Sequence, residues 1–156
     1  MKKKHDFCFL GACYPECHPE SPDRICEMKN LKKKVDAGAS MLLSQLFFDN
    51  DLFYRFNESC KIAGLSVPVI PGVMPVINAS QIKRMVSLCG ASVPAKFKRI
   101  IERYEDNRTA LFDAGMAYAL SQIIDLCVRD IDGIHLYTMN NPVVARKICE
   151  GIRNII

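Results

Sequence analysis

Four short apolar runs, each followed by a segment with helical periodicity, most constrain how this chain folds. The runs cover residues 7–12, 41–48, 67–70 and 131–137. Each run is too short for a buried helix, and we therefore interpret it as a strand. Helical segments separate the runs and supply the crossovers that parallel pairing requires. The sequence predicts an α/β fold with four parallel strand–helix units.

The helices are predicted from apolar spacing and from residues that start or stop a helix. In the first, 25–37, apolar residues recur every three or four positions, and Gly38 then favours a left-handed stop. The other helices are expected over residues 49–63, 81–88, 94–103, 107–128 and 142–152. Two prolines predict a rigid loop over 71–76.

The number of units indicates half of a barrel. A complete eightfold barrel needs at least about 200 residues, whereas this chain has 156. We expect residues 1–156 to form a single domain and the strand 7–12 to be buried on both faces. Polar residues lie toward or just past the ends of three of the strands, namely Tyr14, Gln45 and Tyr137. Ligands bind at the carboxyl ends of parallel strands, so these residues predict one functional rim.

Composition argues against several classes of partner. The net charge is +4, and much of the basic excess lies in two short lysine runs, 2–4 and 32–34. Nucleic-acid proteins normally concentrate more basic residues on one face, so no nucleic-acid partner is predicted. No run approaches the roughly 18 apolar residues of a membrane span, and no signal peptide is recognisable. We expect a cytoplasmic protein without a membrane partner.

The eight cysteines are predicted to be reduced thiols. None forms a CxxC pair, and several lie in apolar helical patterns typical of small core residues. One group, Cys13, Cys17, His18 and Cys26, is an alternative zinc site. Its spacing matches none of the usual ligand pairs, so no metal site is predicted.

Five motifs, in the same order and spacing, resemble a known family. They lie at residues 12–20, 30–39, 45–49, 70–75 and 135–140. Together they resemble the C-terminal half of methylenetetrahydrofolate reductase, a flavin-dependent barrel enzyme, over nearly the whole chain. The resemblance implies the C-terminal half of a TIM (β/α)8 barrel. It also implies that NADH or NADPH reduces bound FAD, which reduces 5,10-methylenetetrahydrofolate to 5-methyltetrahydrofolate.

The resemblance also assigns site residues. Those placed against FAD are Ala12, Tyr14, His18, Glu27, Asn30, Lys33 and Lys34. Those placed against the folate or the nicotinamide are Gln45, Gln81, Tyr137 and Asn141. The family's acidic catalytic residue belongs to an N-terminal half that this sequence does not match, so no catalytic residue is assigned here.

The residue types suit these roles. The ammonium groups of Lys33 and Lys34 would neutralise a pyrophosphate, and a flavin itself carries hydride, so the protein must mainly bind and orient it. Gln45 offers a donor and an acceptor to the amide-like edge of a pterin or nicotinamide. Structural alternatives are a capping role for Gln81 and a rim anchor for Tyr137.

Departures from the family leave a second function open. Glu27 stands where the family usually has aspartate, and Lys33 where it often has arginine. Asn141 replaces a common arginine, and Met85 replaces an aromatic residue. The alternative is a non-catalytic truncated half-barrel, or one subunit of a split enzyme. Because a half-barrel leaves two outer strands unpaired, we expect self-association or a complementary N-terminal half.

Overall fold

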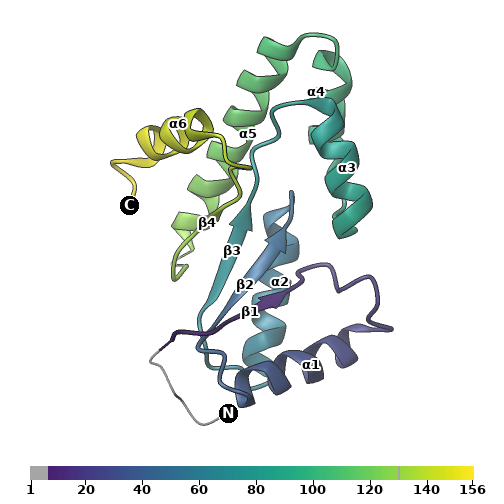
Figure 1. Cartoon of the computed structure of the whole chain (residues 1–156), viewed down its shortest axis with the longest axis vertical. Helices are drawn as coiled ribbons and strands as arrows, with labels where there is room; N and C mark the ends of the chain where they lie inside the picture. The colour runs from purple at the N-terminus through teal and green to yellow at the C-terminus, as the bar shows by residue number, and fades with distance from the viewer. Residues whose placement is uncertain (1–6, 130) are drawn as a thin grey trace.

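The computed structural model describes residues 7–129 and 131–156 and has an α/β fold (Figure 1). Within these residues one sheet is formed by β1 (Leu10–Cys13), β2 (Met41–Leu46), β3 (Val69–Val73) and β4 (His135–Leu136). The spatial order is β1-β2-β3-β4, and each neighbouring pair is parallel. The predicted α/β fold with four parallel strand–helix units is confirmed.

Helices connect the strands in the pattern that parallel pairing requires. They are α1 (Arg24–Asp36), α2 (Asn50–Ile62), α3 (Ala79–Cys89), α4 (Ala95–Tyr104), α5 (Arg108–Val128) and α6 (Pro142–Ile152). Side chains just before the helices accept hydrogen bonds from first-turn amides, as Asp23 does from Cys26 and Asn78 from Gln81, both at 2.7 Å.

The strand bounds differ from those predicted. β1 begins at Leu10 rather than at residue 7, and β4 comprises only two residues. β3 continues through Pro71 to Val73, so the first half of the expected 71–76 loop is strand. The prediction that the first strand is buried on both faces is wrong, because Gly11 and Cys13 are buried whereas Leu10 and Ala12 are exposed.

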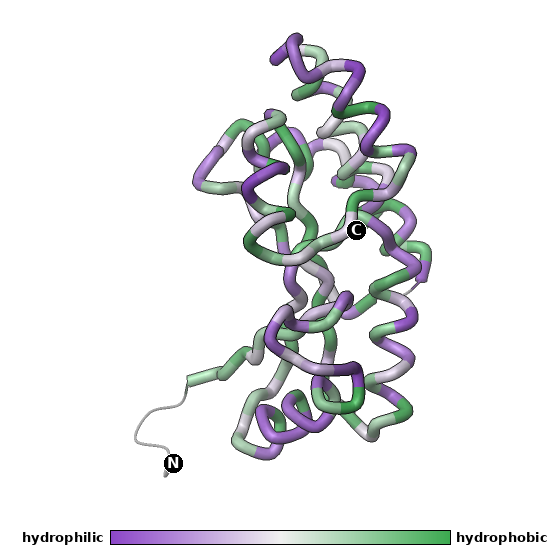
Figure 2. Tube along the Cα trace, turned by 90° about the vertical axis from the view of Figure 1, so that its right-hand side faces the viewer, coloured by the Kyte–Doolittle hydropathy of each residue, from purple (hydrophilic) through white to green (hydrophobic). Residues whose placement is uncertain are grey.

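The core lies on the helix-covered face of the sheet. Leu42 on β2 and Val73 on β3 belong to one apolar cluster with residues of α1, α2, α5 and α6. A second cluster, including Leu46 and Phe97, joins the end of β2 to α3 and α4. Figure 2 shows hydrophobic and hydrophilic residues interspersed along the trace, as expected of helices with one buried side.

α5 organises the helical layer. It packs against α2, α4, α6 and β3 and contributes Leu111, Met116 and Ile123 to the core. Its length and composition would also allow it to cross a membrane, which the sequence analysis did not anticipate. That criterion is weak by itself, because core helices meet it too. The contacts with four other elements favour a core helix.

Gly115 of α5 tests this packing. A Cβ built there would meet the backbone carbonyl of Val76, whereas one at Gly151 of α6 would meet only the end of the Leu120 side chain. Gly115→Ala should lower the free energy of unfolding by about 1–3 kcal/mol, because the Val76 backbone, unlike a side chain, cannot rotate away from the new methyl group. Gly151→Ala, the control, should change it by less than about 1 kcal/mol, since alanine favours helix. Urea unfolding measures both, and equal effects would contradict this account.

Candidate functional site

The three predicted rim residues line one small pocket on the face of the sheet opposite the helix-covered core. This rim pocket has a volume of about 180 Å³ and is lined by Leu10, Gly11, Ala12, Tyr14, Leu43, Gln45 and Tyr137. Ala12 pairs with Leu43 across β1 and β2, and alternate residues of a strand share a face. Gln45, two residues beyond Leu43, lines the same pocket as Leu43 and Ala12. Tyr14 and Tyr137 enter from the segments that follow β1 and β4.

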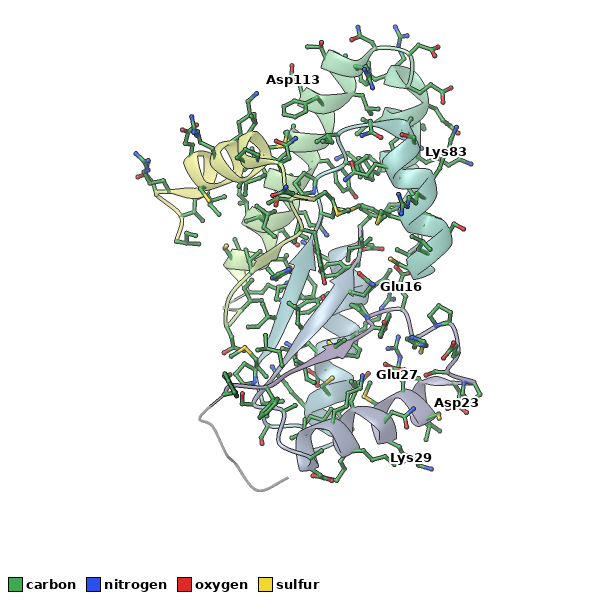
Figure 3. The ribbon with its side chains drawn as sticks, viewed as in Figure 1. Glu16, Asp23, Glu27, Lys29, Lys83 and Asp113 are labelled. Carbon is green, nitrogen blue, oxygen red and sulfur yellow. The ribbon has the colours of Figure 1, made fainter. Side chains whose placement is uncertain are left out.

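A second, polar pocket lies between the β1–α1 loop and α1. It has a volume of about 400 Å³ and is lined by Tyr14, His18, Glu20, Ser21, Glu27, Asn30 and Lys34. Five of the seven residues predicted to contact FAD are in this lining. Tyr14 lines both pockets, which are therefore adjacent. Figure 3 shows Glu16 and Glu27 near this loop, with Lys83 and Asp113 toward the opposite end of the molecule.

Hydrogen bonds from other elements hold the β1–α1 loop in place. The Arg24 guanidinium of α1 donates to the carbonyl oxygens of Tyr14 and Pro15. The Glu16 carboxylate accepts from the backbone N–H of Ser92, 3.0 Å away, and ties the loop to the α3–α4 connection. A charged side chain thus fixes the loop from each side.

His18 is oriented within this loop. Its Nδ1 accepts from the backbone N–H of Glu20 at 3.1 Å, and its ring meets that of Tyr14 edge-on, with 4.5 Å between centroids. A neutral imidazole whose Nδ1 accepts carries its proton on Nε2. The neutral ring therefore offers one N–H donor.

The two lysines expected at the cofactor differ in position. The Lys34 ammonium donates to the carbonyl oxygen of Ala12 at 2.6 Å, so it lies over the end of β1 and lines the polar pocket. Lys33 is exposed in the last turn of α1 and is not part of either lining. The geometry therefore brings one of these two cations to the site.

Two further polar groups face the polar pocket from α1. Glu27 is only 3% exposed, and its carboxylate accepts from the Ser21 hydroxyl at 2.7 Å. The Asn30 amide contacts the Cys26 sulfur at 3.8 Å, a weak hydrogen bond. The pocket thus combines a cation, an amide and a buried carboxylate, which suits a ligand carrying both phosphates and hydroxyls. Ser21 and Glu20 were not predicted from the sequence.

The tyrosines of the rim pocket remain protonated at neutral pH. Burial is the main cause that raises the pKa of Tyr14 and of Tyr137 above the usual value near 10.

The alternative zinc site would include the Cys13 thiol, and burial strongly raises the pKa of this thiol. A zinc ligand would need the thiolate. Among the described residues no group of three or more metal-ligating side chains gathers, so nothing here favours the alternative zinc site.

Ser44 is a site residue that the sequence analysis missed. It is completely buried, and its hydroxyl accepts from the backbone N–H of Gly72 at 2.8 Å. The Tyr137 hydroxyl donates to the carbonyl oxygen of Ser44 at 3.0 Å. The only signal available was a second polar residue beside Gln45 in an otherwise apolar strand.

Gln81 and Asn141 lie at helix starts and line neither pocket. The Gln81 side-chain oxygen accepts from the backbone N–H of Ile77 at 3.1 Å. The Asn141 side-chain oxygen accepts from Val143 and Val144 at the start of α6. The Asn141 oxygen is therefore the N-cap of α6, and the Gln81 oxygen holds the backbone just before α3, while their amide nitrogens have no hydrogen bond among the described residues. Their roles toward a folate stay predictions.

The fold and site define a class: a parallel α/β half-barrel with adjacent polar and mixed pockets near its strand ends. Residues 1–153 match the family model for methylenetetrahydrofolate reductase. The 5,10-methylenetetrahydrofolate reductase of Escherichia coli (strain K12) is 33% identical over 98% of this chain. The chain therefore belongs to the methylenetetrahydrofolate reductase family, and the resemblance seen in the motifs is confirmed.

Two further comparisons define the extent of the match. Methylenetetrahydrofolate reductase (NADH) 1 of Arabidopsis thaliana is 35% identical over 83% of this chain and 23% of its own length. The chain spans about half the length of its bacterial relatives, 52% for the Escherichia coli enzyme. An uncharacterized Clostridium thermocellum protein that binds two copies of 5-methyl-5,6,7,8-tetrahydrofolic acid shares the fold, with a TM-score of 0.60 and 16% identity. That match covers 96% of this chain and 54% of the other.

Tyr137→Phe tests the rim geometry and its pH dependence. The variant loses the hydrogen bond to Ser44, so its free energy of unfolding at pH 7 should fall by about 1 kcal/mol. Because the folded-state pKa of Tyr137 is raised, the wild type keeps this contribution below about pH 10 and loses it as pH rises through the folded-state pKa. The difference between the two proteins should shrink accordingly in urea unfolding from pH 7 to 11. Tyr104→Phe, at an exposed tyrosine, is the control and should be neutral.

Proposed function

We propose that this chain is the FAD-binding half of a reductase that converts 5,10-methylenetetrahydrofolate to 5-methyltetrahydrofolate with NADH or NADPH. The observation that carries the proposal is the adjacency of the two pockets: five predicted FAD residues line one, and Ala12, Gln45 and Tyr137 line the other. Tyr14 joins them. Support for a folate substrate comes from the folate bound by the Clostridium thermocellum protein, and for NADH from the name of the Arabidopsis relative.

The donor set of the polar pocket fits FAD. Lys34 would attract the pyrophosphate, and Asn30 and His18 add N–H donors for oxygen atoms. The buried Glu27 carboxylate would accept from ribityl or ribose hydroxyls, as it now accepts from Ser21. When bound, the flavin supplies hydride transfer, and these residues hold and orient it.

The rim pocket would hold the reacting ligand beside the flavin. Gln45 provides an amide, the aromatic rings of Tyr14 and Tyr137 provide flat apolar walls, and Leu10 and Leu43 exclude water. Flat pterin or nicotinamide rings suit such walls. The roles proposed for Gln81 and Asn141 rest on the family resemblance alone.

A partner would complete the site, because both outer strands of the described sheet have an open edge. Phe9 and Leu10 beside the β1 edge are 50% and 53% exposed. Next to β4, an apolar groove of about 480 Å³ lies between α5, α6 and Ile155. Exposed apolar edges favour association.

We propose that residues 1–156, as one domain, pair with a second copy or with a complementary N-terminal half. A non-catalytic half-barrel is the alternative function.

Flavin uptake by the full chain tests the cofactor assignment. Titration with FAD, followed by flavin fluorescence, should show binding by the wild type. Lys34→Gln should weaken it about tenfold, because a charge-assisted contact to phosphate is lost. Lys32→Gln is the matched control, since Lys32 is exposed and, among the described residues, forms its ion pair with Asp36, at 3.8 Å. Absence of uptake, alone and with the N-terminal half of a relative, would overturn the assignment; bleaching by NADH in that mixture would support the reductase over the non-catalytic alternative.

Analytical ultracentrifugation tests the open edges. The wild type should sediment as a species larger than a 17.6 kDa monomer. Phe9→Lys should shift it toward the monomer, because a charge beside the edge opposes pairing. Ile62→Lys, at an exposed residue of α2, should not. A stable monomeric wild type would count against self-association and leave the complementary half as the remaining partner.

A further inference from the structure

β2 contains an irregularity at the point where it reaches the rim pocket. Leu43 pairs with Ile70 and Leu46 with Gly72, so three steps along β2 match two steps along β3. The extra residue lies in the Ser44–Gln45 segment and has the properties of a β-bulge. Bulges often re-aim a side chain beside a functional site. The direction of Gln45 therefore depends on what stabilises this bulge.

The Ser44 side chain provides that stabilisation. Its buried hydroxyl donates to the carbonyl oxygen of Gln45 at 3.0 Å and accepts from the backbone N–H of Gly72 at 2.8 Å. One hydroxyl thus satisfies two backbone groups that the irregular pairing leaves without their regular partners. Tyr137 adds a bond to the Ser44 carbonyl at 3.0 Å.

Gly72 makes this arrangement possible. A Cβ built at Gly72 would meet the carbonyl oxygen of Ser44 and would lie 2.6 Å from Cε2 of Tyr137. Only a residue without a side chain lets the Tyr137 ring and the bulge approach the backbone of β3 this closely. Ser44, Gly72 and Tyr137 therefore hold three neighbouring strand ends together. We call this set of contacts the lock.

The lock determines which end of the Gln45 amide a ligand meets. The Gln45 side-chain oxygen accepts from the backbone N–H of Leu46 at 2.9 Å, and only the oxygen can accept from that donor. The amide nitrogen has no hydrogen bond among the described residues, and Gln45 lines the rim pocket. Gln45 therefore offers N–H donors to the pocket.

We propose that Ser44 is a positioning residue: by pinning the bulge, it makes Gln45 a donor that selects ligands presenting a hydrogen-bond acceptor, such as a ring carbonyl. This inference rests on the proposed function for its ligand, but the geometry of the lock can be measured without one. The two parts therefore have separate readouts.

The ligand-free test uses the ¹⁵N-labelled full chain. In Ser44→Ala, hydrogen exchange of the Gly72 amide should become about tenfold faster, because its acceptor is lost. The Gln45 side-chain amide resonances should also move. Ser44→Thr keeps a hydroxyl and should retain slow exchange. Gln122→Met, which removes a buried donor to the Phe47 carbonyl on the helix-facing side, is the control for general destabilisation. Unchanged Gly72 exchange and Gln45 resonances in Ser44→Ala would overturn the inference, whether or not any ligand binds.

The ligand test uses calorimetry with 5-methyltetrahydrofolate as probe. Ser44→Ala should weaken binding about tenfold, Ser44→Thr should restore most of it, and Gln122→Met should leave it within about twofold. If Ser44 acts through Gln45, the double variant Ser44→Ala/Gln45→Ala should bind no more weakly than Gln45→Ala alone. Gln45→Glu, which keeps the acceptor but loses the donor, should bind no better than Gln45→Ala.

The outcomes separate three claims: the positioning role of Ser44, the donor role of Gln45 and the proposed folate function. Additive losses in the double variant would overturn the role of Ser44 in positioning Gln45, and full binding by Gln45→Glu would overturn the donor assignment. A wild type that binds no probe, with Gly72 exchange and Gln45 resonances changed as expected in Ser44→Ala, would count against the proposed folate function while supporting the lock.

Discussion

The parallel direction of the four strands is the constraint on which the rest of the structure depends. It forces a helical crossover after every strand and places all strand ends that carry polar residues at one edge. Tyr14, Gln45 and Tyr137 lie far apart in the sequence, yet they line one pocket. The helices cover the opposite face with apolar side chains, so the pocket face is left open to ligands and partners.

The helices are predictable because the interactions that start them are local. Asp23, Asn78 and Asn107 each accept from an amide three residues ahead, and such a pattern can be read from the sequence. Strand bounds depend on distant residues instead. β4 exists only where His135 and Leu136 meet Gly72 and Val73, so the apolar run 131–137 overstates it. The exposure of Leu10 likewise depends on which face of the sheet the helices cover.

The candidate site likewise combines residues that local sequence predicts with residues whose positions depend on tertiary contacts. Residues at or just past the ends of apolar runs, such as Tyr14 and Tyr137, are predicted by position, and the family motifs add His18 and Lys34. The sequence does not indicate that Lys33 turns away while Lys34 reaches the Ala12 carbonyl, because one helical position separates them. Nor does it indicate the bulge in β2, since the register of β2 on β3 is a tertiary property. Buried Ser44 is therefore found only from the structure.

Tyr14 explains how the two pockets would cooperate under the proposed function. Hydride transfer needs its donor and acceptor atoms close together, so a bound cofactor and substrate would have to meet at a shared boundary. Tyr14 lines both pockets, its ring is braced edge-on by His18, and Arg24 holds its backbone carbonyl at 3.1 Å. Burial raises the pKa of Tyr14, so its hydroxyl stays a neutral donor at physiological pH and puts no negative charge beside the flavin. A rigid, uncharged aromatic wall at this boundary would position both ligands.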